Sequence, residues 1–200
     1  MVDVVVVGDT RNRGQGRDYA ELLSGFEGVR QVHLVYDRNV GAAVNRGLRR
    51  SKTPYVVIAG GDCWFDQGSF KKLLGHTDHR GYRFAHPRGL PLPTRGFLDT
   101  GIVFREFLLQ NPMDDWPDYC EEVKFRQPEF QAGLVKPIDV TFEHRHDPSL
   151  PHMSSRTMWT RKLWSYAYKF HVAPPLGALR RGILGQRKAP EAPTGAHLGG

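Results

Sequence analysis

Hydrophobic and polar positions along the first 75 residues follow a pattern typical of strands and helices in alternation. Val2–Gly8 is a nearly continuous β-branched run, which predicts a strand that is buried on both faces. Two further apolar runs predict strands at Val32–Tyr36 and Pro54–Ala59. Apolar residues at helical spacing predict helices over Asp18–Phe26, Gly41–Ser51 and Gln67–Leu74. This alternation predicts an α/β fold, a mostly parallel sheet with helices on both faces.

The pattern is less regular in the rest of the chain. Short apolar runs predict strands at Tyr82–His86, Gly101–Arg105 and Val135–Phe142. A helix is expected over Asp118–Phe130, which follows a proline and precedes a glycine. We therefore expect a globular domain over residues 1–150, an aromatic and basic helical extension over 151–185, and a disordered tail over 186–200.

Composition limits the class of protein. The 200 residues, with 40% hydrophobic content, suffice for one domain with a core. No apolar run is long enough for a transmembrane helix, and the N-terminus does not resemble a signal peptide. Two cysteines do not make a disulfide framework, so we expect a reducing, cytoplasmic location.

The net charge of +7 comes from the end of the chain. Residues 1–150 hold 20 basic and 20 acidic residues, whereas residues 151–200 hold 8 basic residues and one acid. A solvated helix that packs on the domain explains such a segment. Contact with nucleic acid, with an acidic substrate or with a membrane surface would explain it too, and its aromatic residues suit a peripheral membrane contact.

Candidate chemistry lies at the carboxyl ends of the predicted strands, where α/β sheets bind ligands. Asp9, Asp37 and Asp62 each follow one of these strands. Asp62 also follows Gly60 and Gly61, which let a bulky ligand approach the backbone. A carboxylate in this position can hold Mg²⁺ or Mn²⁺, although it can also cap the helix that follows.

Three segments together resemble the core of the family-2 glycosyltransferases, which have the GT-A fold. They are Asn39-Val40-Gly41, Asn45-Arg46-Gly47-Leu48 and the strand that ends at Asp62-Cys63-Trp64. In that family an Asn-x-Gly turn leads into a helix with a second Asn-x-Gly, and the next strand ends in Asp-x-Asp. The resemblance covers about residues 2–150. Val2–Thr10 is similar to the family's second strand, so the first strand-helix unit is expected to be missing.

The resemblance implies metal-dependent transfer of a sugar from a UDP-, GDP- or dTDP-sugar to an acceptor hydroxyl, with inversion. It implies that Asp62 and His144 bind Mn²⁺ or Mg²⁺, and that Glu122 or its neighbour Glu121 is the catalytic base. The residues that it implies for nucleotide-sugar binding are Asp9, Asn39, Gly41, Asn45, Gly61 and Trp64. The acceptor is expected to be a glycan, a lipid-linked molecule or a protein.

Several of these residues also fit roles that involve neither catalysis nor ligand binding. Glu121 and Glu122 can be solvated helix charges, His144 a surface histidine, and Cys63 a packed residue at a strand end. Gly60 stands where the family has its first aspartate, which favours a catalytically inactive binding or assembly module as the alternative function. A basic nucleic-acid-binding protein ranks last, because no recognition motif for nucleic acid occurs in the chain.

Overall fold

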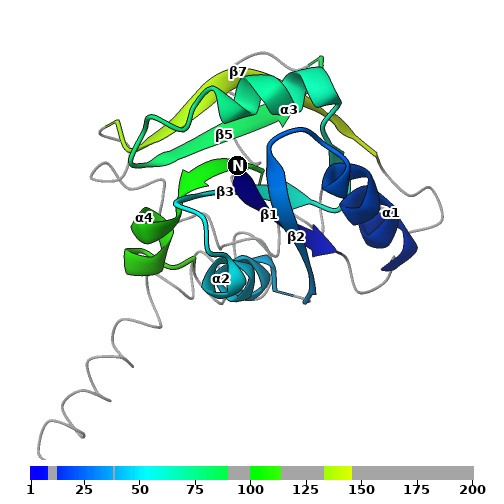
Figure 1. The fold of residues 1–200 in the computed structure, drawn as a ribbon, viewed down its shortest axis with the longest axis horizontal. Helices are drawn as coiled ribbons and strands as arrows, with labels where there is room; N and C mark the ends of the chain where they lie inside the picture. The colour runs from blue at the N-terminus through cyan, green and yellow to red at the C-terminus, as the bar shows by residue number, and fades with distance from the viewer. Residues whose placement is uncertain (9–12, 38, 90–99, 114–132, 146–200) are drawn as a thin grey trace, which may run out of the picture. The chain divides into compact units, whose positions relative to one another are not determined.

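The structure, a computed structural model, describes residues 1–8, 13–37, 39–89, 100–113 and 133–145. The strands of the described part are β1 (Val2–Gly8), β2 (Val29–Tyr36), β3 (Tyr55–Gly60), β4 (Cys63–Trp64), β5 (Tyr82–Pro87), β6 (Gly101–Phe104) and β7 (Val135–His144). Its helices are α1 (Arg13–Ser24), α2 (Val40–Arg50), α3 (Gln67–Leu74) and α4 (Arg105–Gln110) (Figure 1). The predicted helix over Asp118–Phe130, the extension over 151–185 and the tail over 186–200 lie outside the described residues.

The strands form one sheet in the order β2-β1-β3-β6-β5-β7-β4. The pairs β1–β2, β1–β3 and β5–β7 are parallel. The pairs β3–β6, β5–β6 and β4–β7 are antiparallel, so the sheet is mixed. The predicted α/β class is confirmed, with fewer parallel pairs than expected because β6 and β4 run against their neighbours. Strand β1 lies between β2 and β3, and all its residues are buried, as its unbroken apolar run predicts.

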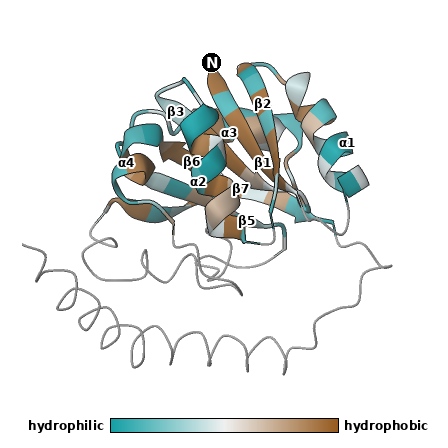
Figure 2. Cartoon of the chain, turned by 90° about the horizontal axis from the view of Figure 1, so that it is seen from below, coloured by the Kyte–Doolittle hydropathy of each residue, from teal (hydrophilic) through white to brown (hydrophobic). Residues whose placement is uncertain are grey.

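Helices cover both faces of the sheet. On one face, Tyr19 and Leu23 of α1 and Phe70 and Leu73 of α3 pack in a single core. On the other face, α2 and α4 bury a second core, formed by Ala43, Val44, Leu48, Phe107 and Leu108 against the strands. Figure 2 shows hydrophobic strands in the interior and hydrophilic positions on the outer sides of the helices. The arrangement is a three-layer α/β domain, a class in which ligands bind at the carboxyl ends of the strands.

Several elements differ from the sequence prediction. Helix α1 begins at Arg13, five residues before the predicted start at Asp18. Its first turn has no apolar periodicity, and it is held instead by a tertiary contact, since the Tyr36 hydroxyl donates to the carbonyl of Arg13 (2.6 Å). Helix α4 and the two-residue strand β4 were not predicted, and β7 continues two residues further than expected, to His144. This extension of β7 matters most, because it pairs with β4.

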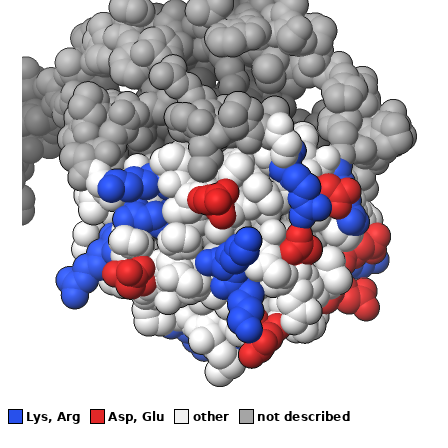
Figure 3. All heavy atoms as spheres, turned by 90° about the horizontal axis from the view of Figure 1, so that it is seen from above, with Lys and Arg blue, Asp and Glu red and all other residues white. Residues whose placement is uncertain are grey.

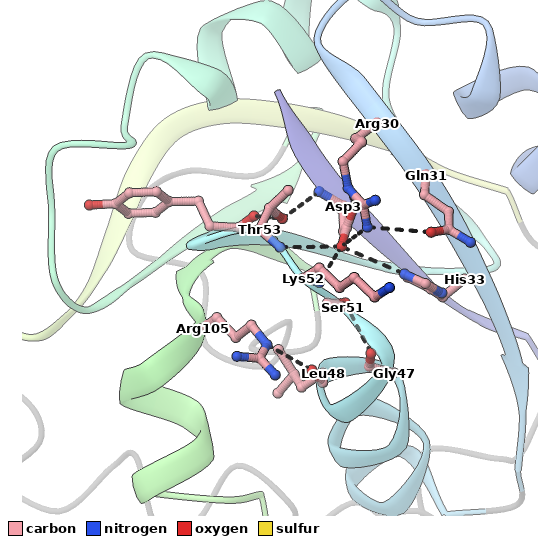
Figure 4. Close-up of polar contacts among 11 residues, drawn as sticks. Asp3, Arg30, Gln31, His33, Gly47, Leu48, Ser51, Lys52, Thr53 and Arg105 are labelled. Carbon is pink, nitrogen blue, oxygen red and sulfur yellow. Dashed lines mark hydrogen bonds and ion pairs between the residues drawn. The ribbon is translucent and has the colours of Figure 1, made fainter.

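A buried carboxylate links β1, β2 and the segment before β3, at the edge of the sheet where β1 begins (Figure 4). Asp3 is fully buried, and Arg30 donates to both of its carboxylate oxygens, at 2.6 and 2.8 Å. The backbone N–H of Lys52 also donates to Asp3 (2.6 Å), and the hydroxyl of Thr53 accepts from the Asp3 backbone (2.8 Å). Because these groups satisfy the carboxylate, the network stabilises the fold.

On the face shown in Figure 3, the described surface is neither mainly basic nor mainly acidic. Basic and acidic side chains are interspersed there among uncharged residues. Within the part of the chain that the structure describes, no helix has the length and apolar character needed to cross a membrane.

Candidate active site at the ends of strands β3 and β7

The candidate site lies at the edge of the sheet where parallel strands end. Strand β3 ends at Gly60, and Asp62 follows two residues later. Strand β7 ends at His144, and its last two residues pair with β4 in the register Cys63↔His144 and Trp64↔Glu143. The chain therefore turns back after Asp62 and places this carboxylate beside the end of a strand from the other half of the domain.

Asp62 is held from several directions. Its Oδ2 atom lies 3.1 Å from Nε2 of His144, and its Oδ1 atom accepts from the Cys63 thiol at 3.4 Å. Its backbone carbonyl accepts from the N–H of Arg145 at 2.7 Å. The side chains of His144 and Asp62 are 37% and 46% exposed, so the pair is fixed in place and still reaches solvent.

The environment of Asp62 favours its charged form. Burial alone would raise the pKa of this carboxyl. The hydrogen bond and the charge of His144, with the Cys63 thiol, outweigh burial and hold the pKa below its ordinary value of 3.8. Asp62 is therefore a carboxylate at neutral pH, which is the form that binds a cation.

The two residues predicted to bind the metal are thus brought together. Oxygen and nitrogen donors from Asp62 and His144, with the thiol of Cys63, lie within 4.8 Å of one another. The first two are common ligands of divalent metals, and their 3.1 Å separation suits two donors on one ion. The donor set fits a divalent cation.

Trp64 forms one side of this site. Its ring stacks on Tyr19 with centroids 4.7 Å apart, and the guanidinium of Arg145 lies 4.0 Å from its centroid. Its indole N–H donates to the carbonyl of Gly61 at 2.9 Å. Beneath it, the Tyr19 hydroxyl accepts from the backbone N–H of Phe65 (2.9 Å). Trp64 is therefore a positioned, partly exposed aromatic ring beside Asp62, and its contact with a sugar stays a prediction.

Glycines bring helix α1 close to the strand ends next to Asp62. A Cβ atom on Gly61 would lie 3.2 Å from the carbonyl of Val7 and 3.3 Å from Cα of Gly8. A Cβ on Gly16, in α1, would also lie 3.3 Å from Cα of Gly8. Because these neighbours are backbone atoms, the close approach favours glycine at both positions. Gly61 therefore lets β1, β3 and α1 meet at the edge that carries Asp62.

The other residues predicted to bind the nucleotide sugar lie in or before helix α2. Asn39 caps the helix, and its side chain accepts from the N–H of Ala42 at 2.9 Å. Gly41 is buried within the helix. The buried amide of Asn45 donates to the carbonyl of Met113 (2.7 Å) and accepts from its N–H (3.0 Å). The structure gives these residues roles in the fold, and their ligand contacts stay predictions.

Three predicted site residues, Asp9, Glu121 and Glu122, lie outside the described residues. Sequence analysis in turn missed Tyr19 and Arg145, which both contact Trp64. Nothing in the sequence marks Tyr19 as a site residue, because its position fits the apolar face of a helix. Arg145 directly follows His144, but its contact depends on the β4–β7 register, which the sequence does not reveal.

Comparisons with known proteins agree with this architecture. The sequence model described as glycosyl transferase family 2 matches residues 2–90, a stretch that runs from β1 through Asp62 to the end of β5. No curated protein matches the chain in sequence. Because the match begins within β1, the expected absence of a first strand-helix unit stays a prediction.

Solved structures provide a likeness in fold. S. aureus TarS 1–349, solved in complex with UDP-GlcNAc, matches at a TM-score of 0.55 with 12% identity, over 78% of this chain and 61% of that one. The chain thus spans less than two thirds of its length. A second structure of S. aureus TarS 1–349 matches at a TM-score of 0.48 with 10% identity, over 86% of this chain and 73% of that one. A protein of Aquifex aeolicus VF5 matches at a TM-score of 0.45 with 13% identity, over 69% of this chain and 86% of that one. These last two scores are too low to support a conclusion.

Proposed function

We propose that this chain, whose residues 2–90 match the model of glycosyl transferase family 2, transfers a sugar from a nucleotide sugar to an acceptor hydroxyl. The observation that supports this most is the charged Asp62 carboxylate beside His144, at the edge of the sheet where α/β domains bind ligands. The site is partly exposed, so a bulky diphosphate can reach it.

Asp62 and His144 are proposed to hold Mn²⁺ or Mg²⁺. When bound, the cation neutralises the negative charge that develops on the leaving nucleoside diphosphate. The protein's part is to fix the two ligands. The N–H of Arg145 holds the Asp62 backbone, and the β4–β7 pairing holds His144. Both ligands are therefore placed before the donor arrives, which reduces the cost of ordering them on binding.

The donor is proposed to be a UDP-, GDP- or dTDP-sugar. The TarS complex with UDP-GlcNAc supports a UDP-sugar as the first to test. Trp64 offers its ring at the side of the site, and Arg145 next to it carries a positive charge suited to a phosphate or a polar sugar. Asp9 is proposed to contact the base or ribose. Asn39, Gly41 and Asn45 are proposed to shape the donor site through helix α2.

Glu122, or its neighbour Glu121, is proposed to take the proton from the acceptor hydroxyl as its oxygen attacks the anomeric carbon. One displacement of this kind inverts the anomeric configuration. The proposed acceptor is a glycan, a lipid-linked molecule or a protein. The basic, aromatic segment 151–185 would suit peripheral contact with a membrane that carries a lipid-linked acceptor.

Gly60 motivates one competing function. It is a buried residue of β3 without a side chain, at the position where the family has its first aspartate. If this loss abolishes turnover, the domain binds a nucleotide sugar without transferring it. Binding and turnover therefore have to be measured separately.

Calorimetry with a panel of UDP-, GDP- and dTDP-sugars, each with and without Mn²⁺, tests the proposal. We expect metal-dependent heat with at least one donor, and its loss in Asp62→Ala. Release of nucleoside diphosphate from that donor then distinguishes an enzyme from a binding module. No metal-dependent heat with any donor would contradict both functions, and binding without turnover in the presence of acceptor extracts would favour the module.

A further inference from the structure

Cys63 packs in the core beneath helices α1 and α3, as expected, and its thiol also lies beside the candidate site. Its side chain is 2% exposed, yet its thiol lies 3.4 Å from Oδ1 of Asp62. The other carboxylate oxygen, Oδ2, lies 3.1 Å from His144. One carboxylate thus lies between a thiol and an imidazole, and all three are metal-binding groups.

We propose that Asp62, Cys63 and His144 form a three-ligand site for a thiophilic transition metal such as Zn²⁺ or Co²⁺, in preference to Mg²⁺. This inference rests on the proposed function in that it concerns the same site, but it adds a ligand and a metal class. It predicts a metal–sulfur bond in a site where only oxygen and nitrogen ligands were expected.

The strand pairing explains why the thiol faces the site. Cys63 and His144 are direct partners in an antiparallel pair, so their side chains point to the same face and their Cβ atoms lie about 5 Å apart. Asp62 precedes Cys63 and is held to β7 by the N–H of Arg145, at 2.7 Å. Two paired segments, residues 62–64 and 143–145, therefore carry all three ligands and are fixed to each other by backbone hydrogen bonds.

The distances suit one ion. Bonds from Zn²⁺ to sulfur, nitrogen and oxygen are about 2.0–2.3 Å long, so neighbouring donors lie about 3–3.6 Å apart around it. The two carboxylate oxygens of Asp62 have such separations from the other donors, with Oδ2 at 3.1 Å from the imidazole and Oδ1 at 3.4 Å from the thiol. All three donors lie within 4.8 Å of one another, so an ion that binds all of them has to bring the widest pair closer by about 1 Å.

The site also has an open side. The side chains of Asp62 and His144 are 46% and 37% exposed, whereas Cys63 is buried. Three protein ligands with an open position are typical of catalytic zinc, whereas structural zinc has four. The open position faces solvent, where a phosphate oxygen of the donor can complete the coordination.

The chemistry of the three ligands determines which metal ion the site prefers. Mg²⁺ prefers six oxygen ligands in octahedral geometry and retains several waters, so imidazole and thiolate are poor ligands for it. Imidazole and thiolate favour Zn²⁺ and Co²⁺. The site should therefore bind Co²⁺ or Zn²⁺ far more tightly than Mg²⁺.

Titration of the metal-free full chain with Co²⁺ tests this inference by absorption. We expect visible d–d bands and a near-ultraviolet thiolate-to-cobalt charge-transfer band that saturate at one ion per chain. Cys63→Ser should lose the charge-transfer band and bind Co²⁺ about ten- to a hundredfold more weakly. Cys120→Ser, which changes the chain's other cysteine, is the matched control and should retain the band. Circular dichroism confirms that each variant is folded.

Absence of the charge-transfer band in the wild type, its persistence in Cys63→Ser, or displacement of Co²⁺ by equimolar Mg²⁺ would each overturn the three-ligand site. Failure of this inference is distinct from failure of the proposed function. A donor that binds with Mn²⁺ in a chain without the band leaves glycosyl transfer intact and removes the Cys63 ligand. A saturating band in a chain that binds no donor supports the metal site and contradicts the function.

Discussion

His144 lies 3.1 Å from Asp62 although 82 positions separate the two residues in the chain. The contact exists because the last two residues of β7 pair with the two residues of β4 that follow Asp62. Two segments, neither of which identifies a site alone, thus meet in one place. The proposed metal site depends on this pairing.

The Asp62–His144 pair should determine the affinity for metal. Asp62→Asn keeps the size of the side chain but removes its charge, and we expect Mn²⁺ to bind at least about tenfold more weakly. His144→Ala should weaken Mn²⁺ about ten- to a hundredfold. Electron paramagnetic resonance of free Mn²⁺ measures both. Glu143→Gln is the matched control, because Glu143 bonds Arg145 instead (2.9 Å) and should leave the affinity unchanged. Wild-type affinity for Mn²⁺ in both Asp62→Asn and His144→Ala would show that the metal binds at another site.

The hydroxyl of Tyr19 should stabilise the fold around Trp64. Tyr19→Phe retains the stacked ring but leaves the buried N–H of Phe65 without its acceptor, so we expect a loss of about 1–3 kcal/mol in the free energy of unfolding. Urea denaturation measures it. Tyr36→Phe removes a more exposed bond to Arg13 and should cost less than about 1 kcal/mol. Equal losses in the two variants would show that the Tyr19 hydroxyl has no special role.

Asp3 should make stability depend on pH. Burial alone would raise the pKa of this carboxyl. Its hydrogen bonds with Arg30 and the N–H of Lys52 outweigh burial and lower the pKa below 3.8. A carboxyl with a lowered folded pKa stabilises the protein above its unfolded pKa, and this stability is lost as pH falls through the folded pKa. We expect the free energy of unfolding to fall steeply below about pH 4, and Asp3→Asn to flatten that slope.

Urea denaturation between about pH 7 and pH 2 measures the slope. Asp78→Asn is the control, because its carboxylate is 74% exposed and its ion-pair partner His79 is exposed too. Asp3→Asn should also be less stable than the wild type at pH 7, since Arg30 then loses its charged partner. An unchanged slope in Asp3→Asn would mean that other carboxyls govern acid unfolding.

Asn45 separates a role in folding from a role in binding. Its amide makes two buried bonds with the backbone of Met113, so Asn45→Ala should lower the free energy of unfolding by about 2–3 kcal/mol. Asn39→Ala, which removes a helix cap, should cost about 1 kcal/mol. Thermal and urea unfolding measure both. If Asn45→Ala keeps its stability but loses donor affinity, Asn45 contacts the ligand and is not chiefly a structural residue.

Much of the fold could be predicted because local patterns decide it. The unbroken run in β1 implies an interior strand, and the apolar spacing of α2 and α3 implies helices that pack on the sheet. The first turn of α1 could not be predicted, because a contact with Tyr36 and close packing of Gly16 hold it. Two residues, Cys63 and Trp64, are too few to show the periodicity of a strand, so β4 was missed as well.

The site was predictable only in part. Asp62 follows a buried strand and precedes a helix, which makes it a candidate by position, and His144 follows from the family resemblance. Their contact, and the thiol of Cys63 beside them, follow from the register of β4 against β7. Register depends on tertiary packing, and a sequence of this kind does not show it. Roles for Asp9, Glu121 and Glu122 stay predictions from the resemblance.

A crystal structure of the full chain with Mn²⁺ and UDP tests the central claim most directly. We predict one anomalous manganese peak about 2 Å from a carboxylate oxygen of Asp62 and from Nε2 of His144, with the diphosphate of UDP bound to the same ion. A manganese peak that touches neither residue, or a diphosphate bound away from this edge of the sheet, would contradict the account.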